Sequence, residues 1–280
     1  MKNEYHITVE FGDITAVKHL SDALSSANLS RQKIKQTMQK GCVWLETKDA
    51  QGQPYIQRLR RAKKVLSPGD ILHCYYDDKV LATEPPEATL VSDEGDYSIW
   101  SKPAGMLSQG SKWGDHSTIY RWAEKHLKPE RPAFIVHRLD RAATGLIILA
   151  HKKQVASLFS KMFQQHEIEK HYHVTVEGNF EKLLINGALS KIIDTKIDSK
   201  TAISHASFLS FNTEKNESLL DVSIETGRKH QIRKHLLSIG YPVVGDRFYG
   251  TGNTKQDLQL TAISLSFICP ITKKKKLYNY

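Results

Sequence analysis

The chain has 280 residues, of which 40% are hydrophobic and 25% charged, and its net charge is +10. These proportions are ordinary for a globular protein, and the length suits one large domain or two smaller ones. No apolar run approaches the roughly 18 residues of a membrane-spanning helix. Residues 1–10 are polar and lack the apolar stretch of a signal peptide. Cys42, Cys74 and Cys269 form no CxxC pair and predict no disulfide framework. We therefore expect a cytoplasmic protein without a membrane partner.

The positive charge is concentrated between residues 31 and 64. This segment has ten basic residues against two acidic ones, Glu46 and Asp49, so its net charge is +8. A concentrated basic patch is typical of proteins that bind the phosphate backbone of nucleic acids. Basic patches also bind acidic membranes and protein partners, or form a solvated face. The basic residues are Arg31, Lys33, Lys35, Lys40, Lys48, Arg58, Arg60, Arg61, Lys63 and Lys64.

The first predicted elements are two helices and a strand. Residues 20–27 are predicted to form a short helix and residues 31–40 a second one, with Ser30 as its N-cap. Gly41 is placed to end the second helix in the left-handed conformation. A short strand is expected at residues 42–46. This segment predicts a small α/β domain with a cationic helix.

A domain boundary is predicted at Thr83-Glu84-Pro85-Pro86, because this stretch interrupts any regular element. The expected domains are residues 1–86 and 87–280. In the second domain several strands follow one another without an intervening helix, which favours a mixed, largely antiparallel sheet flanked by helices, an α+β fold. Strands are predicted at residues 97–102, 144–150, 171–177, 206–211, 218–225, 258–262 and 265–268, and helices at 117–127, 155–164 and 229–239.

One block of the second domain places a carboxylate between cations. In His137-Arg138-Leu139-Asp140-Arg141, Asp140 lies between two arginines and just before the apolar run 144–150. Neighbouring cations favour the charged form of a carboxylate. Two interpretations follow, a structural ion pair in a turn or a reactive carboxylate.

A second block lies in the predicted helix 229–239. Ile232, Leu236 and Ile239 form a buried stripe at helical spacing. Arg233 lies at the margin of this stripe, where it could reach a partly buried anion, and Lys229 is expected one turn earlier on the same face. The alternative is a solvated basic helix face.

Together these blocks resemble the RluA family of pseudouridine synthases, from about residue 97 to residue 270. Four ordered motifs support the resemblance: Lys102-Pro103-Ala104-Gly105; His137-Arg138-Leu139-Asp140 with Gly145 to Ala150; Lys170-His171-Tyr172; and Gly227-Arg228, His230-Gln231-Ile232-Arg233, Gly245-Asp246 and Tyr249-Gly250. The resemblance implies an isomerase that converts specific uridines of RNA to pseudouridine.

The basic first domain resembles the small RNA-binding domain named after ribosomal protein S-four. The matching stretches are Leu29 to Lys33, Gly41 to Val43 and Val65 to Ile71. This resemblance implies that Arg31, Lys33 and Lys35 contact RNA, and it suits a subgroup that acts on large-subunit ribosomal RNA. Transfer RNA stays open as a substrate, and a helical cap on the larger domain is the structural alternative.

The family resemblance also implies roles for individual residues. Asp140 is the carboxylate that acts at the ribose of the target uridine, and Arg233 pairs with it. Tyr172 packs on the uracil and is placed for proton removal from C5. Arg138 holds the target nucleotide out of the stack, Leu260 lines the base pocket, and Arg228 contacts RNA. Covalent addition to C1′ and abstraction of a ribose proton both stay open.

The implied reaction breaks the bond from C1′ to N1 of uracil and rejoins the base through C5. Nothing is oxidised and no group is lost, so no cofactor and no metal are expected. The pair His171 and His173 has no third ligand at a convincing spacing. A base inside a duplex is out of reach, so the enzyme is expected to flip it out. We expect a monomer.

The chain departs from the family pattern near Asp140. Ala143-Thr144 stands where the family usually has Thr-Ser, Lys229 where it has Thr, and Thr261 where it has His. These departures motivate an alternative function, a non-catalytic RNA-binding or ribosome-assembly protein on the same fold. A third possibility is an N-glycosidase that frees uracil.

Overall fold

The computed structural model describes residues 2–10, 12–184, 188–252 and 256–280. The chain divides into two compact units. The N-terminal unit comprises residues 1–85 and 109–122, and the large unit comprises residues 86–108 and 123–280. Among the described residues no helix is long and apolar enough to cross a membrane.

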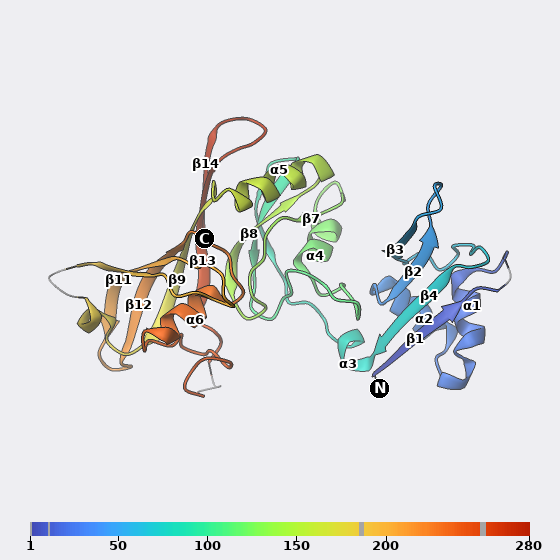
Figure 1. The fold of residues 1–280 in the computed structure, drawn as a ribbon, viewed down its shortest axis with the longest axis horizontal. Coiled ribbons are helices and arrows are strands. Elements are labelled where there is room, and N and C mark those ends of the chain that lie inside the picture. The colour runs from blue at the N-terminus through green and yellow to red at the C-terminus, as the bar shows by residue number, and fades with distance from the viewer. Residues whose placement is uncertain (1, 11, 185–187, 253–255) are drawn as a thin grey trace. The chain divides into compact units, whose positions relative to one another are not determined.

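Four of the described strands form the sheet of the N-terminal unit, in the antiparallel order β1-β4-β2-β3 (Figure 1). The strands are β1 (Lys2–Thr8), β2 (Val43–Lys48), β3 (Pro54–Arg58) and β4 (Ile71–Asp77). The helices are α1 (Ala16–Ala23), α2 (Arg31–Gln39) and the short α3 (Asp78–Leu81), and residues Ser25–Ala27 form a 3-10 turn.

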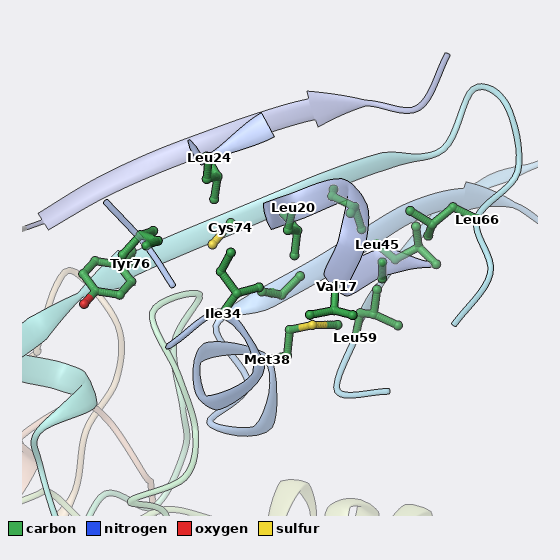
Figure 2. Close-up of a cluster of buried hydrophobic side chains, with 14 of the residues drawn as sticks. Val17, Leu20, Leu24, Ile34, Met38, Leu45, Leu59, Leu66, Cys74 and Tyr76 are labelled. Carbon is green, nitrogen blue, oxygen red and sulfur yellow. The ribbon is translucent and has the colours of Figure 1, made fainter. Parts of the chain in front are cut away.

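The core of this unit lies between the helices and one face of the sheet. In β4, Leu72, Cys74 and Tyr76 are buried and alternate with half-buried residues, as expected for a strand with one covered face. Figure 2 shows side chains of the two helices, such as Leu20 and Ile34, directed toward these strands. Burial of such apolar side chains stabilises the unit.

The predicted ends of α2 are confirmed to within one residue. The Ser30 Oγ accepts a hydrogen bond from the Lys33 N–H at 3.3 Å, and Gly41 has a φ of +77°. The prediction for the first helix is wrong, because α1 begins at Ala16 and residues 25–27 form a separate 3-10 turn. Its buried residues are Ala16, Val17 and Leu20, so the apolar stripe begins before the predicted start.

Within the described residues, ten strands form the sheet of the large unit. Eight of them have the order β10-β11-β12-β9-β13-β8-β6-β5, while β14 pairs with β13 and β7 with β8. Among these described strands only β13 and β8 pair in parallel, so the expected mixed, largely antiparallel α+β fold is confirmed. The long hairpin of β13 and β14 is drawn in red in Figure 1. The strands are β5 (Thr89–Asp93), β6 (Tyr97–Lys102), β7 (Phe134–Ile135), β8 (Thr144–Ala150), β9 (Glu169–Glu177), β10 (Ser190–Ile193), β11 (Ser204–Asn212), β12 (Glu217–Ile224), β13 (Leu260–Ile268) and β14 (Lys275–Asn279).

Three helices follow in the chain, α4 (Ile119–His126), α5 (Lys153–Gln164) and α6 (Gln231–Ser238), and a 3-10 helix spans Phe180–Leu183. The strand predicted at residues 144–150 is confirmed in full, and its residues from Gly145 to Ala150 are buried. On α5, Val155, Phe159 and Met162 are buried and pack in a cluster with Tyr97 and Ile148. The strand that follows Asp140 is therefore held in the apolar core.

Two predictions for the large unit are wrong. The two strands expected at 258–262 and 265–268 are one strand, β13, whose register shifts between Ala262 and Ser264. Helix α6 begins at Gln231 rather than at Lys229, because His230 has a left-handed backbone with a φ of +55°. Lys229 is thus outside the helix and does not share a helical face with Arg233.

The close approach of β8 to β13 at Gly145 leaves no room for a side chain. The φ of Gly145 is +105°, and a Cβ there would lie 2.2 Å from the carbonyl oxygen of Ala262. We expect Gly145→Ala to lower the free energy of unfolding by about 3 kcal/mol or more, measured by urea denaturation. Gly95→Ala is the matched control, since Gly95 has a φ of +78° but a Cβ added there would meet no atom within 4 Å. The control should cost about 1 kcal/mol, and equal losses would contradict the role of the close approach.

Candidate active site

The loop that bears Asp140 is fixed by hydrogen bonds on both sides. Ser108 Oγ donates to the Leu139 carbonyl at 2.7 Å and accepts from the Leu139 N–H at 3.0 Å. The Ala143 N–H donates to the Asp140 carbonyl at 3.2 Å, which closes a turn just before β8. The Asp140 backbone therefore has little freedom, which suits a side chain that must be positioned accurately.

Lys102 supports the same loop from inside the protein. Its side chain is fully buried, and its ammonium donates to the carbonyls of Ala143 at 2.6 Å, Pro103 at 2.9 Å and Met106 at 3.1 Å. Burial lowers the pKa of Lys102 to about 8, and the charge of Asp140 acts in the opposite direction. Carbonyl dipoles thus take the place of a carboxylate partner around this ammonium.

Arg233 joins two carboxylates through its guanidinium. Nη1 donates to Asp140 Oδ2 at 3.1 Å, while Nε and Nη2 donate to Asp246 Oδ2 and Oδ1, each at 2.6 Å. The Arg233 side chain is 3% exposed, that of Asp246 0% and that of Asp140 27%. Burial opposes its charge, but the hydrogen bonds to Asp246 and then Asp140 raise the pKa of Arg233. Asp140 therefore has a fixed cationic partner and remains open to solvent.

Asp246 was missed as a site residue, although it lies in one of the family motifs. Its Oδ1 also accepts from the backbone N–H groups of Phe248 at 2.9 Å and Tyr249 at 3.1 Å. Burial alone would raise the pKa of Asp246, but the hydrogen bonds from Arg233 and these backbone groups lower it. Asp246 is thus an ionised anchor that orients Arg233.

The arginines beside Asp140 in the sequence do not pair with it. Among the described residues, Arg233 is the one Arg or Lys that forms an ion pair with Asp140. Arg141 Nε donates instead to the Gly105 carbonyl at 3.0 Å, and Arg138 is exposed. His230 Nε2 lies 3.8 Å from Asp140 Oδ1, and burial lowers the pKa of His230, which favours its neutral form. The ion pair expected between Asp140 and its flanking arginines is therefore not formed, and Arg233 takes that place.

A cavity of about 100 Å³ adjoins the carboxylate of Asp140. Six of the residues proposed from the sequence line it: Arg138, Asp140, Tyr172, Arg228, Arg233 and Leu260. Tyr172 is buried, and burial followed by the charge of Asp140 raises its pKa well above its ordinary value. Its phenol is therefore neutral at physiological pH. The cavity combines one carboxylate, three arginines and an aromatic wall.

Two larger hollows continue from this cavity. A cationic groove of about 700 Å³ shares Arg138, Asp140, Tyr172 and Arg228 with it and adds Lys170 and Lys229. Lys170 Nζ lies 5.5 Å from the ring centroid of Phe163, and burial lowers its pKa. A second cavity of about 450 Å³ shares Asp140, His230 and Arg233 and is lined by Arg247 and Phe248. These hollows flank Asp140 with positive charge and aromatic rings.

Gln231 organises the loop before α6. Its Oε1 accepts from Thr226 Oγ1 at 2.7 Å and from the Arg228 N–H at 3.0 Å, and its Nε2 donates to the Ile203 carbonyl at 2.9 Å. Arg228 Nε donates to the Thr201 carbonyl at 2.9 Å. The position of Arg228 at the cavity is thus fixed by its neighbours. Sequence reasoning gave no role to Gln231 or Lys102, although both lie in the family motifs.

The histidines on β9 are away from this cavity. His171 Nδ1 lies 2.7 Å from Asp221 Oδ1, and His171 and His173 alternate with the buried Tyr172 along the strand. Within the described part of the chain, no group of three or more His, Cys, Asp or Glu residues could hold a metal ion.

The proposed RNA contacts of the N-terminal unit lie on α2. Arg31, Lys33 and Lys35 are exposed. Arg58 and Arg60, which belong to the predicted basic patch, are instead occupied by Asp115, whose side chain is 2% exposed. The Tyr120 hydroxyl donates to the same carboxylate at 2.6 Å. Two of the ten basic residues counted between positions 31 and 64 are therefore paired with Asp115, so fewer cations of this unit are available to a ligand than the sequence predicts.

Comparison with known proteins identifies the family. A family model described as RNA pseudouridylate synthase matches residues 96–238, just over half of the chain. The chain belongs to this family of isomerases that modify RNA. The match includes Asp140, Tyr172 and Arg233.

Individual relatives differ in their named substrates. The chain is 28% identical to tRNA pseudouridine synthase C of Vibrio parahaemolyticus over 218 residues, covering 68% of this chain and 89% of the relative. It is 35% identical to ribosomal large subunit pseudouridine synthase D of Nitrosomonas europaea over 162 residues, covering 54% and 46%.

A solved structure, human RNA pseudouridylate synthase domain containing 4, resembles the fold. The TM-score is 0.54 at 20% identity, covering 68% of this chain and 87% of the human chain.

The two carboxylates bound to Arg233 should differ in their effect on stability. We expect Asp246→Asn to lower the free energy of unfolding by about 3–5 kcal/mol, because it leaves a buried arginine without its main partner. Asp140→Asn should cost about 1 kcal/mol, since the amide oxygen can still accept from Arg233 and only the charge is lost at a partly exposed site. Urea denaturation of both variants measures the difference. A larger loss for Asp140→Asn would show that Asp246 is not the anchor.

Proposed function

We propose that this chain isomerises specific uridines of large-subunit ribosomal RNA to pseudouridine, with Asp140 as the catalytic carboxylate. The observation that supports this most is the joint placement of Asp140, its buried partner Arg233 and the aromatic wall Tyr172 around one cavity. The ribosomal substrate is supported by the relative named for the large ribosomal subunit. Transfer RNA is the rival substrate, because other relatives are named for it.

The reaction needs one reactive carboxylate at the ribose. The bond from C1′ to N1 breaks, the uracil turns, and a bond from C1′ to C5 forms. The proton on C5 then leaves, and N1 gains one, so atoms balance without a cofactor. Arg233 orients Asp140 through its hydrogen bond and ion pair. Covalent addition and proton abstraction at the ribose both fit this geometry.

Two further side chains have proposed roles at the base. Leu260 and Tyr172 line the cavity, and a uracil there would pack on the Tyr172 ring. The raised pKa of Tyr172 favours its phenol form, which supports packing more than removal of the C5 proton. Arg138 is exposed at the mouth of the cavity, where it could occupy the space left by the flipped uridine.

The N-terminal residues 1–86 are proposed to be an RNA-binding domain of the S-four type that serves the catalytic domain 87–280. The exposed cations Arg31, Lys33 and Lys35 on α2 support this proposal. All three are exposed, whereas Ile34 and Met38 of the same helix are buried in the core. Such a surface suits phosphate contacts without base specificity.

Loss of the Asp140 charge should abolish turnover. We expect Asp140→Asn to reduce tritium release from RNA labelled at uracil C5 by at least ~10³-fold, while RNA affinity changes little. Ribosomal and transfer RNA are assayed separately to identify the substrate. Asp221→Asn is the matched control, because Asp221 has a similar exposure of 24% but pairs with His171. Near-normal release by Asp140→Asn would remove Asp140 from its role. Binding without release by the wild type would favour the assembly-factor alternative.

Removal of the α2 cations should weaken binding and its dependence on salt. For Arg31→Gln, Lys33→Gln and Lys35→Gln combined, the slope of log Kd against log salt should fall by up to ~2, as three single-strand phosphate contacts are lost. The control combines Lys273→Gln, Lys274→Gln and Lys275→Gln, three exposed cations near the C-terminus. An unchanged slope in the α2 variant would make this unit a structural cap.

A further inference from the structure

Phe248 is an exposed aromatic residue beside the candidate active site. It is 79% exposed, the largest value among the exposed large hydrophobic residues of the described chain. It lines the cavity of about 450 Å³ that also contains Asp140, His230 and Arg233. A single exposed apolar residue is ordinary on a protein surface, so the position of this ring in a cavity with Asp140, rather than its exposure, points to a ligand.

The backbone of Phe248 is held firmly despite this exposure. Its N–H donates at 2.9 Å to Asp246 Oδ1, the oxygen that also binds Arg233 Nη2. The ring lies 5.5 Å from the Arg233 guanidinium carbon and 6.1 Å from the His230 ring, with an interplanar angle of 25°. The guanidinium of Arg233 thus contacts Asp140 and also lies near the Phe248 ring. Because the backbone of Phe248 is already fixed, less entropy is lost when a ligand binds to the ring.

A cation lies next to the ring in the same cavity. The Arg247 side chain is 63% exposed, and its Nη2 lies 3.8 Å from Oδ1 of Asp257, whose side chain is 77% exposed. Such an exposed pair contributes little and can exchange its partner for a phosphate. An aromatic face with an adjacent exposed guanidinium matches a nucleotide, whose base stacks while its phosphate is bound.

We infer that Arg247 and Phe248 form a subsite for the nucleotide next to the target uridine. This inference rests on the proposed function, which places the uridine in the smaller cavity. The two cavities share Asp140, His230 and Arg233, so adjacent nucleotides of one strand can occupy both. Arg247 and Phe248 stand between Gly245-Asp246 and Tyr249-Gly250, at positions outside the family motif.

Fluorescence of 2-aminopurine tests the subsite without turnover. The probes are short single-stranded RNAs with one uridine in a run of cytidines and 2-aminopurine on its 5′ or its 3′ side. Stacking on Phe248 should quench one of the two probes in the wild type. Phe248→Ala should abolish this quenching and raise Kd roughly 5- to 100-fold, whereas Phe248→Trp should retain it. Ile268→Ala is the control, a 53% exposed apolar residue elsewhere in the large unit.

Quenching of neither probe, or equal quenching in the wild type and Phe248→Ala, would overturn the inference. Tritium release from the same proteins is measured in parallel, so that failure of the subsite can be distinguished from failure of the proposed isomerase activity. If the wild type releases no tritium but quenching depends on Phe248, the isomerase proposal fails and the stacking subsite stands. If the wild type turns over and Phe248→Ala leaves both kcat/KM and quenching unchanged, the subsite fails alone.

Discussion

The guanidinium of Arg233 is the interaction on which the site depends. A cation that is 3% exposed is stable only with compensating partners. Asp246 binds two of its nitrogens and is itself held by backbone N–H groups. One nitrogen remains for Asp140, whose Oδ1 takes no part in that hydrogen bond. The arrangement therefore gives Asp140 a fixed cationic partner without enclosing it.

The register of three strands brings the other groups to this carboxylate. Ala262 of β13 lies opposite Gly145 of β8 on one side and Tyr172 of β9 on the other. Leu260 is two residues away on the same face of β13. The parallel pairing of β8 with β13 thus places the loop of Asp140, the aromatic wall and the apolar wall together. The buried ammonium of Lys102 holds the start of β8 in place, because it donates a hydrogen bond to the carbonyl of Ala143, the residue just before this strand.

Local signals in the sequence were sufficient for some elements and not for others. The cap at Ser30, the glycine at position 41 and the apolar run 144–150 depend on near neighbours, and all were predicted correctly. Strands β1 and β3 were missed, since their exposed or half-exposed residues show no clear apolar alternation. The start of α6 depends on the left-handed backbone of His230, which residue type does not dictate. The contact of Asp140 with Arg233, 93 positions away, was suggested only by family resemblance, and the anchor Asp246 by no local signal.

The departures from the family pattern gain a physical explanation from the same strands. Thr144 and Thr261 face each other where β8 and β13 pair, and their hydroxyl oxygens lie 2.7 Å apart. Two of the unusual residues are therefore in direct contact with each other. Ala143 contributes its carbonyl to Lys102, and a carbonyl is present whatever the side chain. Neither change touches the ion pair of Asp140 and Arg233. Lys229 lines the cationic groove and forms no ion pair with Asp140, so the change at that position also leaves the pair of Asp140 and Arg233 unaltered.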